Sequence, residues 1–336
     1  MCEVGFFEGP EKLMEVWWKC LPPDQTKVLD NTKSGDLRTI SREKWERILE
    51  LVNCQIISVT KNEEMTAYLL SESSMFVSKT RVILKTCGQT TLLYSIKPMM
   101  SMVKEECGLT EIQDFFYSRM SFLEPKLQHA PHQSFDQEAQ WLDKLFPNGA
   151  AYALGRINGR GCWYLYTLNS GVDEPDQTLE ILMQDLDPDI MKEFYKNESS
   201  DVKHVTKISG IKDFIPEALI DDALFDPCGY SMNGLINESY FTIHITPQKE
   251  CSYVSFETNF KLVCYKDLIN KVLCAFKPAK FLMTLFANKD APCSPSIKTF
   301  ENIITGYKRE DFQLCKMKEY NLSYGHFKKD TTSPIS

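Results

Sequence analysis

Four polar residues, Ser71-Glu72-Ser73-Ser74, interrupt a part of the chain that otherwise has the pattern of β-strands. In "AYLLSESSMFVSKTRVILKTCG", residues 67–88, apolar residues lead into Leu70, and a strand-like pattern resumes directly after the serines. A serine cluster at such a position suits more than one kind of chemistry, so each kind has to be weighed against an ordinary turn.

Three interpretations of these serines remain open at the level of the residues. Serine-rich segments are most often polar turns or solvent-facing strand edges. The second interpretation is a hydrolase nucleophile, although no G-x-S-x-G elbow surrounds the serines. In the third, a serine hydroxyl attacks the carbonyl carbon of the preceding residue and turns the amide into an ester. Elimination then cuts the chain, and the resulting dehydroalanine hydrolyses to a pyruvoyl group. This chemistry needs a strained turn with acid and base groups nearby.

A second candidate site is acidic. Asp176, Thr178 and Glu180 alternate in "DQTLE", so in a strand their side chains point to one face. The ordinary interpretation is a solvated acidic strand face. If the carboxylates instead gather in a buried place, they repel one another unless a cation joins them.

The elements that have to position these residues are mixed. Strand patterns occur at 55–60, 67–72, 74–78, 81–86, 150–157, 162–168, 239–246, 252–258 and 280–287. Helical patterns occur at 10–20, 41–52, 92–106, 135–145, 188–195 and 265–276. The strands come in hairpin-like pairs followed by helices, which predicts an α+β fold with largely antiparallel sheet. We find no low-complexity linker and no repeat at solenoid spacing, so one compact unit is expected.

Composition narrows the possible partners. The 336 residues carry a net charge of −8, which argues against a general affinity for nucleic acid or anionic membrane and favours small cationic partners. No apolar run approaches the ~18 residues of a membrane span, and the start "MCEVGFFEGPEKL" lacks the features of a signal peptide. The 12 cysteines form no C-x-x-C pair, so neither a metal site nor a disulfide framework is predicted. We therefore expect a cytosolic protein with reduced cysteines.

The serine segment also carries a resemblance to a known family. "LSESSMFVS" followed by "LKTCG" resembles the processing site of eukaryotic S-adenosylmethionine decarboxylases, which are pyruvoyl enzymes of polyamine synthesis. Further segments resemble the family in order, from about residue 5 to about residue 325: "FFEGPEKLMEVWW", "SGDLRTI", "FFYSR", "FPNGAAY", "CWYLYTL", "PDQTLEILM", "DPCGYSMNG", "FTIHITP" and "SYVSFET". The ordered set, rather than any one motif, makes the resemblance specific.

The resemblance implies a proenzyme that cuts itself between Glu72 and Ser73, giving a small chain of residues 1–72 and a large chain of residues 73–336. Ser73 then becomes a covalent pyruvoyl group, the pyruvate cofactor. The implied reaction is decarboxylation of S-adenosylmethionine to S-adenosylmethioninamine, the aminopropyl donor for spermidine and spermine. It proceeds through a Schiff base between the pyruvoyl ketone and the substrate amine.

The resemblance also implies an architecture. The expected fold is a four-layer α/β/β/α sandwich of two largely antiparallel sheets flanked by helices. It forms one domain over residues 1–326, followed by a disordered tail over 327–336. The expected assembly is a homodimer of processed units.

Roles for the catalytic residues follow from the resemblance in the same way. Cys87 is implied as the proton donor after carbon dioxide leaves, a role suited to a thiol that titrates near neutrality. Ser231 and His244 are implied to assist self-cleavage, Ser231 at the ester and His244 in the elimination. Glu8 and Glu11, expected at the start of a helix, are implied to contact the substrate or assist processing. Without the resemblance, these would be ordinary core, loop or helix-terminal residues.

The implied substrate-binding residues are two aromatic rings and two polar groups. Phe7 and Phe225 match rings that stack on the two faces of adenine and attract the sulfonium cation, and Glu72 borders the same site. Gln248 departs from the family, which has a glutamate there for the ribose hydroxyls; losing the charge weakens binding by about 1 kcal/mol, or severalfold. The alternative functions are therefore a processed but weakly active or non-catalytic regulatory paralogue, and a serine-nucleophile hydrolase.

For the acidic residues, the resemblance implies a putrescine site that activates processing and decarboxylation. A diamine suits such a site because its two ammonium groups neutralise the repulsion between carboxylates. Lys85 is implied as a charged link toward the active site. The implied residues are Glu15, Lys85, Phe116, Asp176, Thr178, Glu180, Glu257, Phe286 and Tyr320.

Overall fold

The computed structural model describes residues 6–20, 35–158, 161–197, 200–294 and 304–330. They divide into two compact units, where the sequence predicted one. The first unit takes its described residues from Glu11–Ala153 and Trp163–Val172, and the second from Met1–Pro10, Leu154–Cys162 and Asp173–Ser336. Each unit is built around one eight-stranded sheet and its own apolar core.

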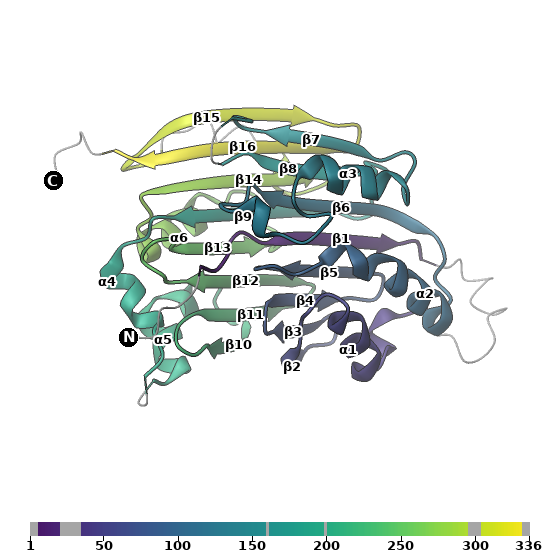
Figure 1. Cartoon of the computed structure of the whole chain (residues 1–336), viewed down its shortest axis with the longest axis horizontal. Helices are drawn as coiled ribbons and strands as arrows, with labels where there is room; N and C mark the ends of the chain where they lie inside the picture. Colours follow the sequence, from purple (N-terminus) through teal and green to yellow (C-terminus); the bar gives the residue numbers. More distant parts are fainter. Residues whose placement is uncertain (1–5, 21–34, 159–160, 198–199, 295–303, 331–336) are drawn as a thin grey trace. The chain divides into compact units, whose positions relative to one another are not determined.

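The sheet of the first unit contains both flanks of the serine segment. Its strands lie in the order β2 (Ile56–Lys61), β3 (Thr66–Leu70), β4 (Ser73–Val77), β5 (Arg81–Thr86), β1 (Lys12–Trp18), β6 (Ile112–Met120), β8 (Trp163–Thr167) and β7 (Ala150–Leu154) (Figure 1). The described pairs β2–β3, β3–β4, β4–β5, β5–β1, β1–β6 and β6–β8 are all antiparallel.

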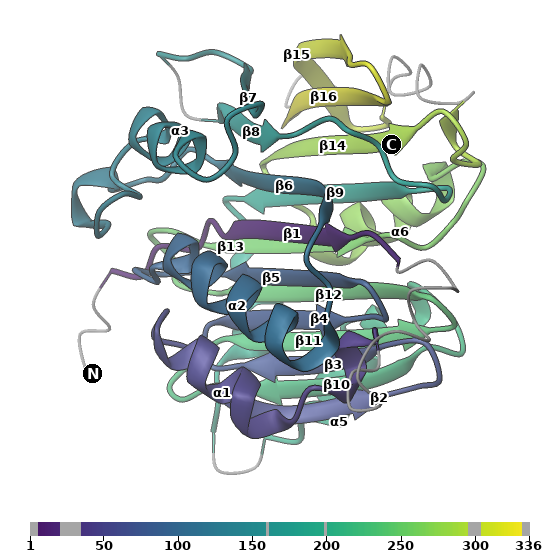
Figure 2. The same ribbon diagram turned by 90° about the vertical axis from the view of Figure 1, so that its right-hand side faces the viewer.

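Helices cover one face of this sheet. They are α1 (Arg42–Glu50), α2 (Ile96–Cys107) and α3 (Phe135–Asp143), and Figure 2 shows α1 and α2 lying across the strands. Alternate strand residues point to that face, so Val16 of β1 packs with Trp45 of α1 and Val103 of α2 in one core. Short 3₁₀ turns occur at Leu37–Thr39, Leu92–Ser95 and Pro125–Leu127.

The second unit repeats this plan. Its sheet has the order β10 (Leu219–Leu224), β11 (Tyr230–Ile236), β12 (Ser239–Thr246), β13 (Tyr253–Thr258), β9 (Gln177–Gln184), β14 (Lys280–Asn288), β16 (Tyr320–Lys329) and β15 (Tyr307–Lys316), with every pair antiparallel. Helices α4 (Pro188–Met191), α5 (Val202–Ile208) and α6 (Lys266–Phe276) supply Met191, Val205 and Val272 to its core. Two 3₁₀ turns lie at Lys192–Phe194 and Ile211–Asp213.

The α+β class with antiparallel sheets is confirmed, but one predicted helix is wrong. Residues 10–20 contain strand β1 instead, and Met14 to Trp18 are all buried. A strand buried on both faces loses the alternation that identifies strands in a sequence, which explains the error. Glu8 and Glu11 therefore do not lie at a helix N-terminus.

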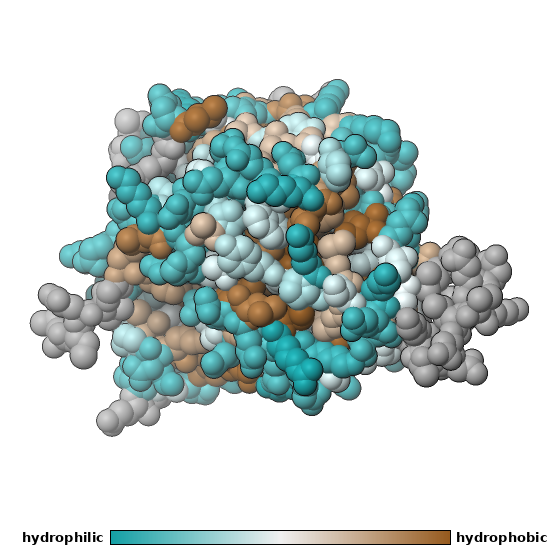
Figure 3. Space-filling model, turned by 45° about the vertical axis from the view of Figure 1, so that its right-hand side comes forward, coloured by the Kyte–Doolittle hydropathy of each residue, from teal (hydrophilic) through white to brown (hydrophobic). Residues whose placement is uncertain are grey.

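Other elements escaped the patterns. Strands β6, β9, β10, β11, β15 and β16 and helix α5 lie outside the predicted segments. Strand β16 runs to Lys329, so its end falls within the expected tail, and residues 331–336 lie outside the described part of the chain. Within the described residues, no helix combines the length and apolar character needed to cross a membrane. Hydrophilic residues cover most of the face in Figure 3, with smaller apolar patches between them.

Candidate active site

The serine segment forms a tight turn between β3 and β4, and Ser73 is strained within it. Leu70 pairs with Ser73 across the turn, and Ser73 pairs with Thr86 on the other side. Its φ of 126° lies in a region that residues with a side chain rarely adopt. Ser73 is 1% exposed, and its Oγ has no hydrogen-bond partner among the described residues. The turn thus combines backbone strain with a buried, uncommitted hydroxyl.

Cys87 lies against the residue that precedes Ser73. Its backbone N–H donates to the Glu72 carbonyl oxygen (3.0 Å), and its Sγ donates to Glu72 Oε2 (3.7 Å). Thr90 Oγ1 donates to the Cys87 carbonyl oxygen (2.9 Å), which fixes the cysteine backbone further. Glu72 in the turn and Cys87 directly after β5 are therefore joined by a main-chain and a side-chain hydrogen bond.

The Cys87 thiol differs from the near-neutral thiol expected from the sequence. Burial raises its pKa well above the usual value, and the nearby carboxylates of Glu72 and Glu11 raise it further. Burial also raises the pKa of the Glu72 carboxyl, against the opposing effects of the Cys87 hydrogen bond and the Lys12 charge. Cys87 therefore keeps its proton at neutral pH, which is the state that a proton donor requires.

The other predicted residues of the first unit lie on buried positions of β1, β5 and β6 or next to β1. Lys85 and Glu11 are both buried, with Nζ and Oε2 4.0 Å apart. Glu15 forms an ion pair with Arg81 (2.8 Å) and accepts a hydrogen bond from Trp17 Nε1. Phe116 is the register partner of Glu15 in β6. Glu15 thus has a cation within its own unit, which the sequence analysis did not predict.

In the second unit, Ser231 and His244 are register partners on β11 and β12. His244 Nδ1 is 2.9 Å from Ser231 Oγ, and its Nε2 is 2.9 Å from Thr242 Oγ1. Thr242 donates its single hydroxyl proton to the Met232 carbonyl oxygen (2.9 Å), so it can accept a hydrogen bond from Nε2–H. This tautomer leaves the Nδ1 lone pair facing Ser231, where it can act as a base.

The predicted substrate-binding residues of the second unit lie at its N-terminal segment and at the β10–β11 and β12–β13 turns. Gln248 is buried at the β12–β13 turn, and Cys251 Sγ donates to its Oε1 (3.3 Å) and lies 3.9 Å from the Phe7 carbonyl oxygen. A Cβ at Gly9 would lie 2.9 Å from the Tyr253 side chain, so only glycine lets the chain pass there. Phe7 and Phe225 are half-buried, and Glu8 is 3% exposed.

The predicted acidic residues come together in the second unit. Thr178 and Glu180 lie in β9, which begins directly after Asp176, and Glu180 pairs directly with Glu257 of β13. Both are buried, and Tyr240 donates a hydrogen bond to Glu257 (2.7 Å). The solvated acidic face is therefore excluded for this pair.

Aromatic rings border this acidic group. Tyr320 donates a hydrogen bond to Asp176 (3.1 Å) and stacks on Phe286, with ring centres 4.3 Å apart and planes at 2°. Phe286 is in turn the register partner of Thr178. Among the described residues, no group of three or more histidine, cysteine, aspartate or glutamate side chains could hold a metal ion.

Sequence reasoning missed a buried ionic cluster beneath α3. Glu138 accepts hydrogen bonds from Tyr117 (2.6 Å) and Arg119 Nε (2.7 Å), and His132 Nδ1 lies 2.7 Å from it. Burial lowers the pKa of His132, and Arg119 holds the pKa of Glu138 below its usual value despite burial. Lys12, fully buried at the start of β1, was also missed. Charged residues inside apolar segments, as in "FFYSR", were the available signal.

Known proteins of one family resemble this chain in sequence and fold. The family model described as adenosylmethionine decarboxylase matches residues 4–328. The S-adenosylmethionine decarboxylase proenzyme of Xenopus laevis is 50% identical over 329 residues, covering 96% of each chain, and that of Drosophila melanogaster is 47% identical over 351 residues, covering 97% of each. The crystal structure of the Trypanosoma brucei AdoMetDC-delta26 monomer matches with a TM-score of 0.61 and 25% identity, covering 76% of this chain and 99% of that one.

Fold and relatives together define an enzyme class, the pyruvoyl-dependent carboxy-lyases. Within that class, the chain belongs to the adenosylmethionine decarboxylase family.

Proposed function

We propose that the chain is a proenzyme that cuts itself between Glu72 and Ser73 and then decarboxylates S-adenosylmethionine in polyamine synthesis. The observation that carries the proposal is the turn itself, in which Ser73 combines a φ of 126° with a buried Oγ that lacks a partner among the described residues. Cutting the chain at this point relieves backbone strain. The cut gives a small chain of residues 1–72 and a large chain that begins at residue 73.

The residues present fit the formation of a pyruvoyl group. Attack of Ser73 Oγ on the Glu72 carbonyl carbon breaks the amide and forms an ester. Elimination removes the Ser73 α-proton, breaks the Cβ–Oγ bond and releases Glu72 as a carboxylate; water then displaces ammonia from the dehydroalanine. Once formed, the group supplies a ketone that condenses with the substrate amine and an electron sink for the departing carbon dioxide.

His244 and Ser231 are proposed to serve self-cleavage. In the tautomer described above the lone pair of His244 Nδ1 faces Ser231 Oγ (2.9 Å), and a basic nitrogen of this kind suits removal of the α-proton in the elimination. Ser231 is proposed to donate a hydrogen bond at the ester stage. Cys87, which holds its proton at neutral pH, is proposed to return a proton to the substrate carbon after decarboxylation.

Substrate binding is proposed to follow the family pattern. Phe7 and Phe225 provide ring faces for adenine and the sulfonium, Glu8 and Glu11 provide carboxylates, and Gln248 provides a neutral acceptor for the ribose. The Cys251 hydrogen bond to Gln248 Oε1 supports a fixed amide orientation at this position.

The acidic group is proposed to bind putrescine. The protein is proposed to act in the cytosol. Asp176, Thr178, Glu180 and Glu257 supply oxygen acceptors for ammonium groups, and the stacked pair of Phe286 and Tyr320 supplies an apolar wall for the methylene chain. Glu15, Phe116 and Lys85, which lie in the first unit, are proposed to take part in the same activation, and Lys85 Nζ lies 4.0 Å from Glu11 Oε2 within that unit. The processed units are proposed to associate as a homodimer.

The test is the mass of the purified protein. We expect a small fragment ending at Glu72 and a large fragment with a blocked N-terminus, together with carbon dioxide release from carboxyl-labelled substrate. Ser73→Ala should stay in one piece and be inactive, and Ser74→Ala is the matched control that should still be cut. An intact wild-type chain that releases carbon dioxide would refute the proposal. Cleavage without turnover would favour the regulatory paralogue, because Gln248 already departs from the family.

A further inference from the structure

Lys12 is a buried cation near the cut site to which no role has been assigned. It opens strand β1 and is fully buried. Its Nζ donates hydrogen bonds to the Gly88 carbonyl oxygen (3.1 Å) and to Gln128 Oε1 (3.1 Å), and lies 5.1 Å from the centre of the Phe122 ring. Gly88 directly follows Cys87, so Lys12 holds the segment that carries the thiol.

Strand register aligns Lys12 with Ser73. Strand β5 lies between β1 and β4, and its Thr86 pairs with Lys12 on one side and with Ser73 on the other. The three residues therefore form one row across the sheet. With strands about 4.8 Å apart, the Cα atoms at the two ends of the row are separated by roughly 10 Å. The positive charge of Lys12 already acts on the Glu72 side chain in the uncut chain.

Self-cleavage changes the charge at this place. Elimination breaks the Cβ–Oγ bond of Ser73, and the electron pair leaves with Oγ, which becomes an oxygen of a new carboxylate on Glu72. This main-chain carboxylate forms beside the half-buried Glu72 side-chain carboxyl and near the carboxylate of Glu11. A further negative charge in such surroundings is unfavourable unless a cation is near, and the same holds for the transition state in which it develops.

We propose that Lys12 is the counter-ion for the carboxylate that self-cleavage creates on Glu72, and hence a positioning residue for the elimination step. This inference rests on the proposed self-cleavage. In this proposal Lys12 stabilises the leaving Glu72 carboxylate, whereas His244 removes the α-proton of Ser73. This role also explains why Lys12 is fully buried in β1, next to β5 and the Cys87–Gly88 segment that follows β5.

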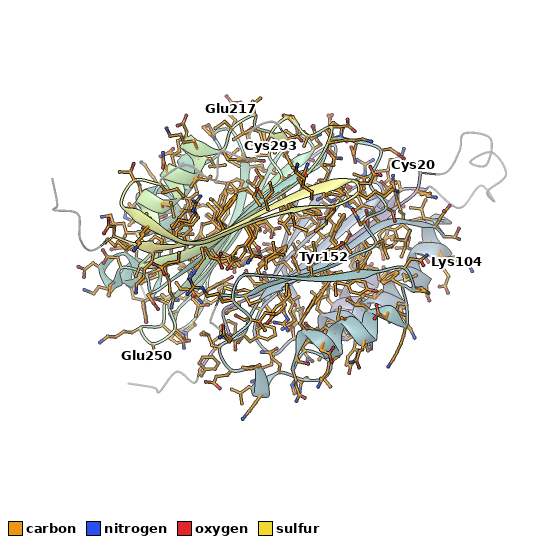
Figure 4. The ribbon with its side chains drawn as sticks, turned by 90° about the horizontal axis from the view of Figure 1, so that it is seen from above. Cys20, Lys104, Tyr152, Glu217, Glu250 and Cys293 are labelled. Atoms are coloured by element: carbon orange, nitrogen blue, oxygen red, sulfur yellow. The ribbon has the colours of Figure 1, made fainter. Side chains whose placement is uncertain are left out.

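The experiment follows cleavage after cell-free synthesis, by pulse labelling and denaturing gels. Lys12→Met and Lys12→Gln remove the charge and keep a chain of similar length, whereas Lys12→Arg keeps the charge. We expect Lys12→Met to be cut at least about tenfold more slowly than wild type, equivalent to about 1.4 kcal/mol in the barrier. Lys12→Arg should be cut faster than Lys12→Met and Lys12→Gln. Lys104→Met, on the outer side of α2 (Figure 4), should be cut at the wild-type rate.

A second readout identifies the slowed step. If the elimination is slowed, the ester accumulates, and hydroxylamine, which cleaves esters but not amides, releases residues 1–72 ending in a hydroxamate. A role in folding alone would not enrich the ester.

Circular dichroism selects the folded variants, and cleavage at the wild-type rate by a folded Lys12→Met or Lys12→Gln would overturn the inference. A folded Lys12→Arg cut more slowly than Lys12→Gln would also overturn it. An intact wild-type chain would overturn this inference and the proposed function together, whereas normal cleavage of both wild type and Lys12→Met would overturn this inference alone.

Discussion

Removing the charge of Glu72 should make the Cys87 thiol more reactive. The Glu72 carboxylate accepts a hydrogen bond from Sγ and opposes formation of a thiolate beside it, so it holds the proton on sulfur. Glu72→Gln keeps the size of the side chain and removes the charge. The comparison belongs in a Ser73→Ala background, because the chain then stays intact and the geometry is the one described above.

The size of the effect follows from the 3.7 Å that separate Sγ and Oε2. Coulomb's law gives about 1 kcal/mol for two unit charges at this distance in water and roughly 4 kcal/mol at an effective dielectric constant of about 20. Glu72 is only half-buried, so we take the lower part of this range, about 1–2 kcal/mol. Alkylation of Cys87 at mildly alkaline pH should therefore be about tenfold faster in Glu72→Gln, because the thiolate is the reactive form.

The assay is the rate of iodoacetamide labelling of the peptide that contains Cys87, measured by mass spectrometry between neutral and alkaline pH. Cys293, whose pKa burial raises to about 12 and on which Glu72 has no influence, serves as an internal reference for a thiol that should stay unreactive. Glu11→Gln should accelerate labelling less than Glu72→Gln, because Glu11 is the weaker of the two carboxylate influences on the thiol. Unchanged labelling in Glu72→Gln, or a larger effect from Glu11→Gln, would refute the electrostatic account of the thiol.

Three further changes test other parts of the molecule. Glu138→Gln should lower the free energy of unfolding by about 3–5 kcal/mol, because it leaves Arg119 buried without its carboxylate; a urea midpoint unchanged from wild type would contradict this. Gln248→Glu should improve the apparent affinity for S-adenosylmethionine severalfold, measured as KM, with little change in kcat. Asp176→Asn should blunt the stimulation of activity by putrescine, and sodium chloride should not reproduce that stimulation, because a buried site is poorly screened by salt. Equal stimulation of the wild type by sodium chloride and by putrescine would contradict the proposed putrescine site.

Local pattern was sufficient for much of the fold. The helices α1, α2, α3 and α6 have an apolar period near 3.6, and the structure has them where they were predicted. The hairpin β4–β5 was also predicted, from two short apolar runs on either side of a polar turn, although both of its strands are buried on both faces. Strand β1 failed because both of its faces are buried, which removes the alternation. Strand β15 is an edge strand with charged residues such as Arg309 and Glu310, which weaken the apolar pattern on which prediction depends.

Some residues of the candidate site could likewise be predicted from the sequence, and others could not. The resemblance supplied Ser73, Cys87 and His244 from motifs that are continuous in sequence, and Asp176 and Glu180 from an alternation within one strand. Lys12 could not be found like this, because its relation to Ser73 exists only through a third strand that pairs with both. The raised pKa of Cys87 was equally hidden, since it depends on burial and on carboxylates that are distant in sequence.

The same strand order explains how a chain can be cut in its sheet without falling apart. A cut before Ser73 assigns β1, β2 and β3 to the small chain and β4 and β5 to the large chain. In the sheet, however, β4 and β5 lie between β3 and β1, so strands of the small chain flank those of the large chain on both sides. Separating the pieces would break three antiparallel ladders, β3–β4, β1–β5 and β1–β6, and the core that β1 shares with α2. The hydrogen bond from the Cys87 N–H to the Glu72 carbonyl oxygen adds a fixed point at the new end itself. Strain at Ser73 can therefore be released locally while the surrounding sheet continues to hold the reacting groups in place.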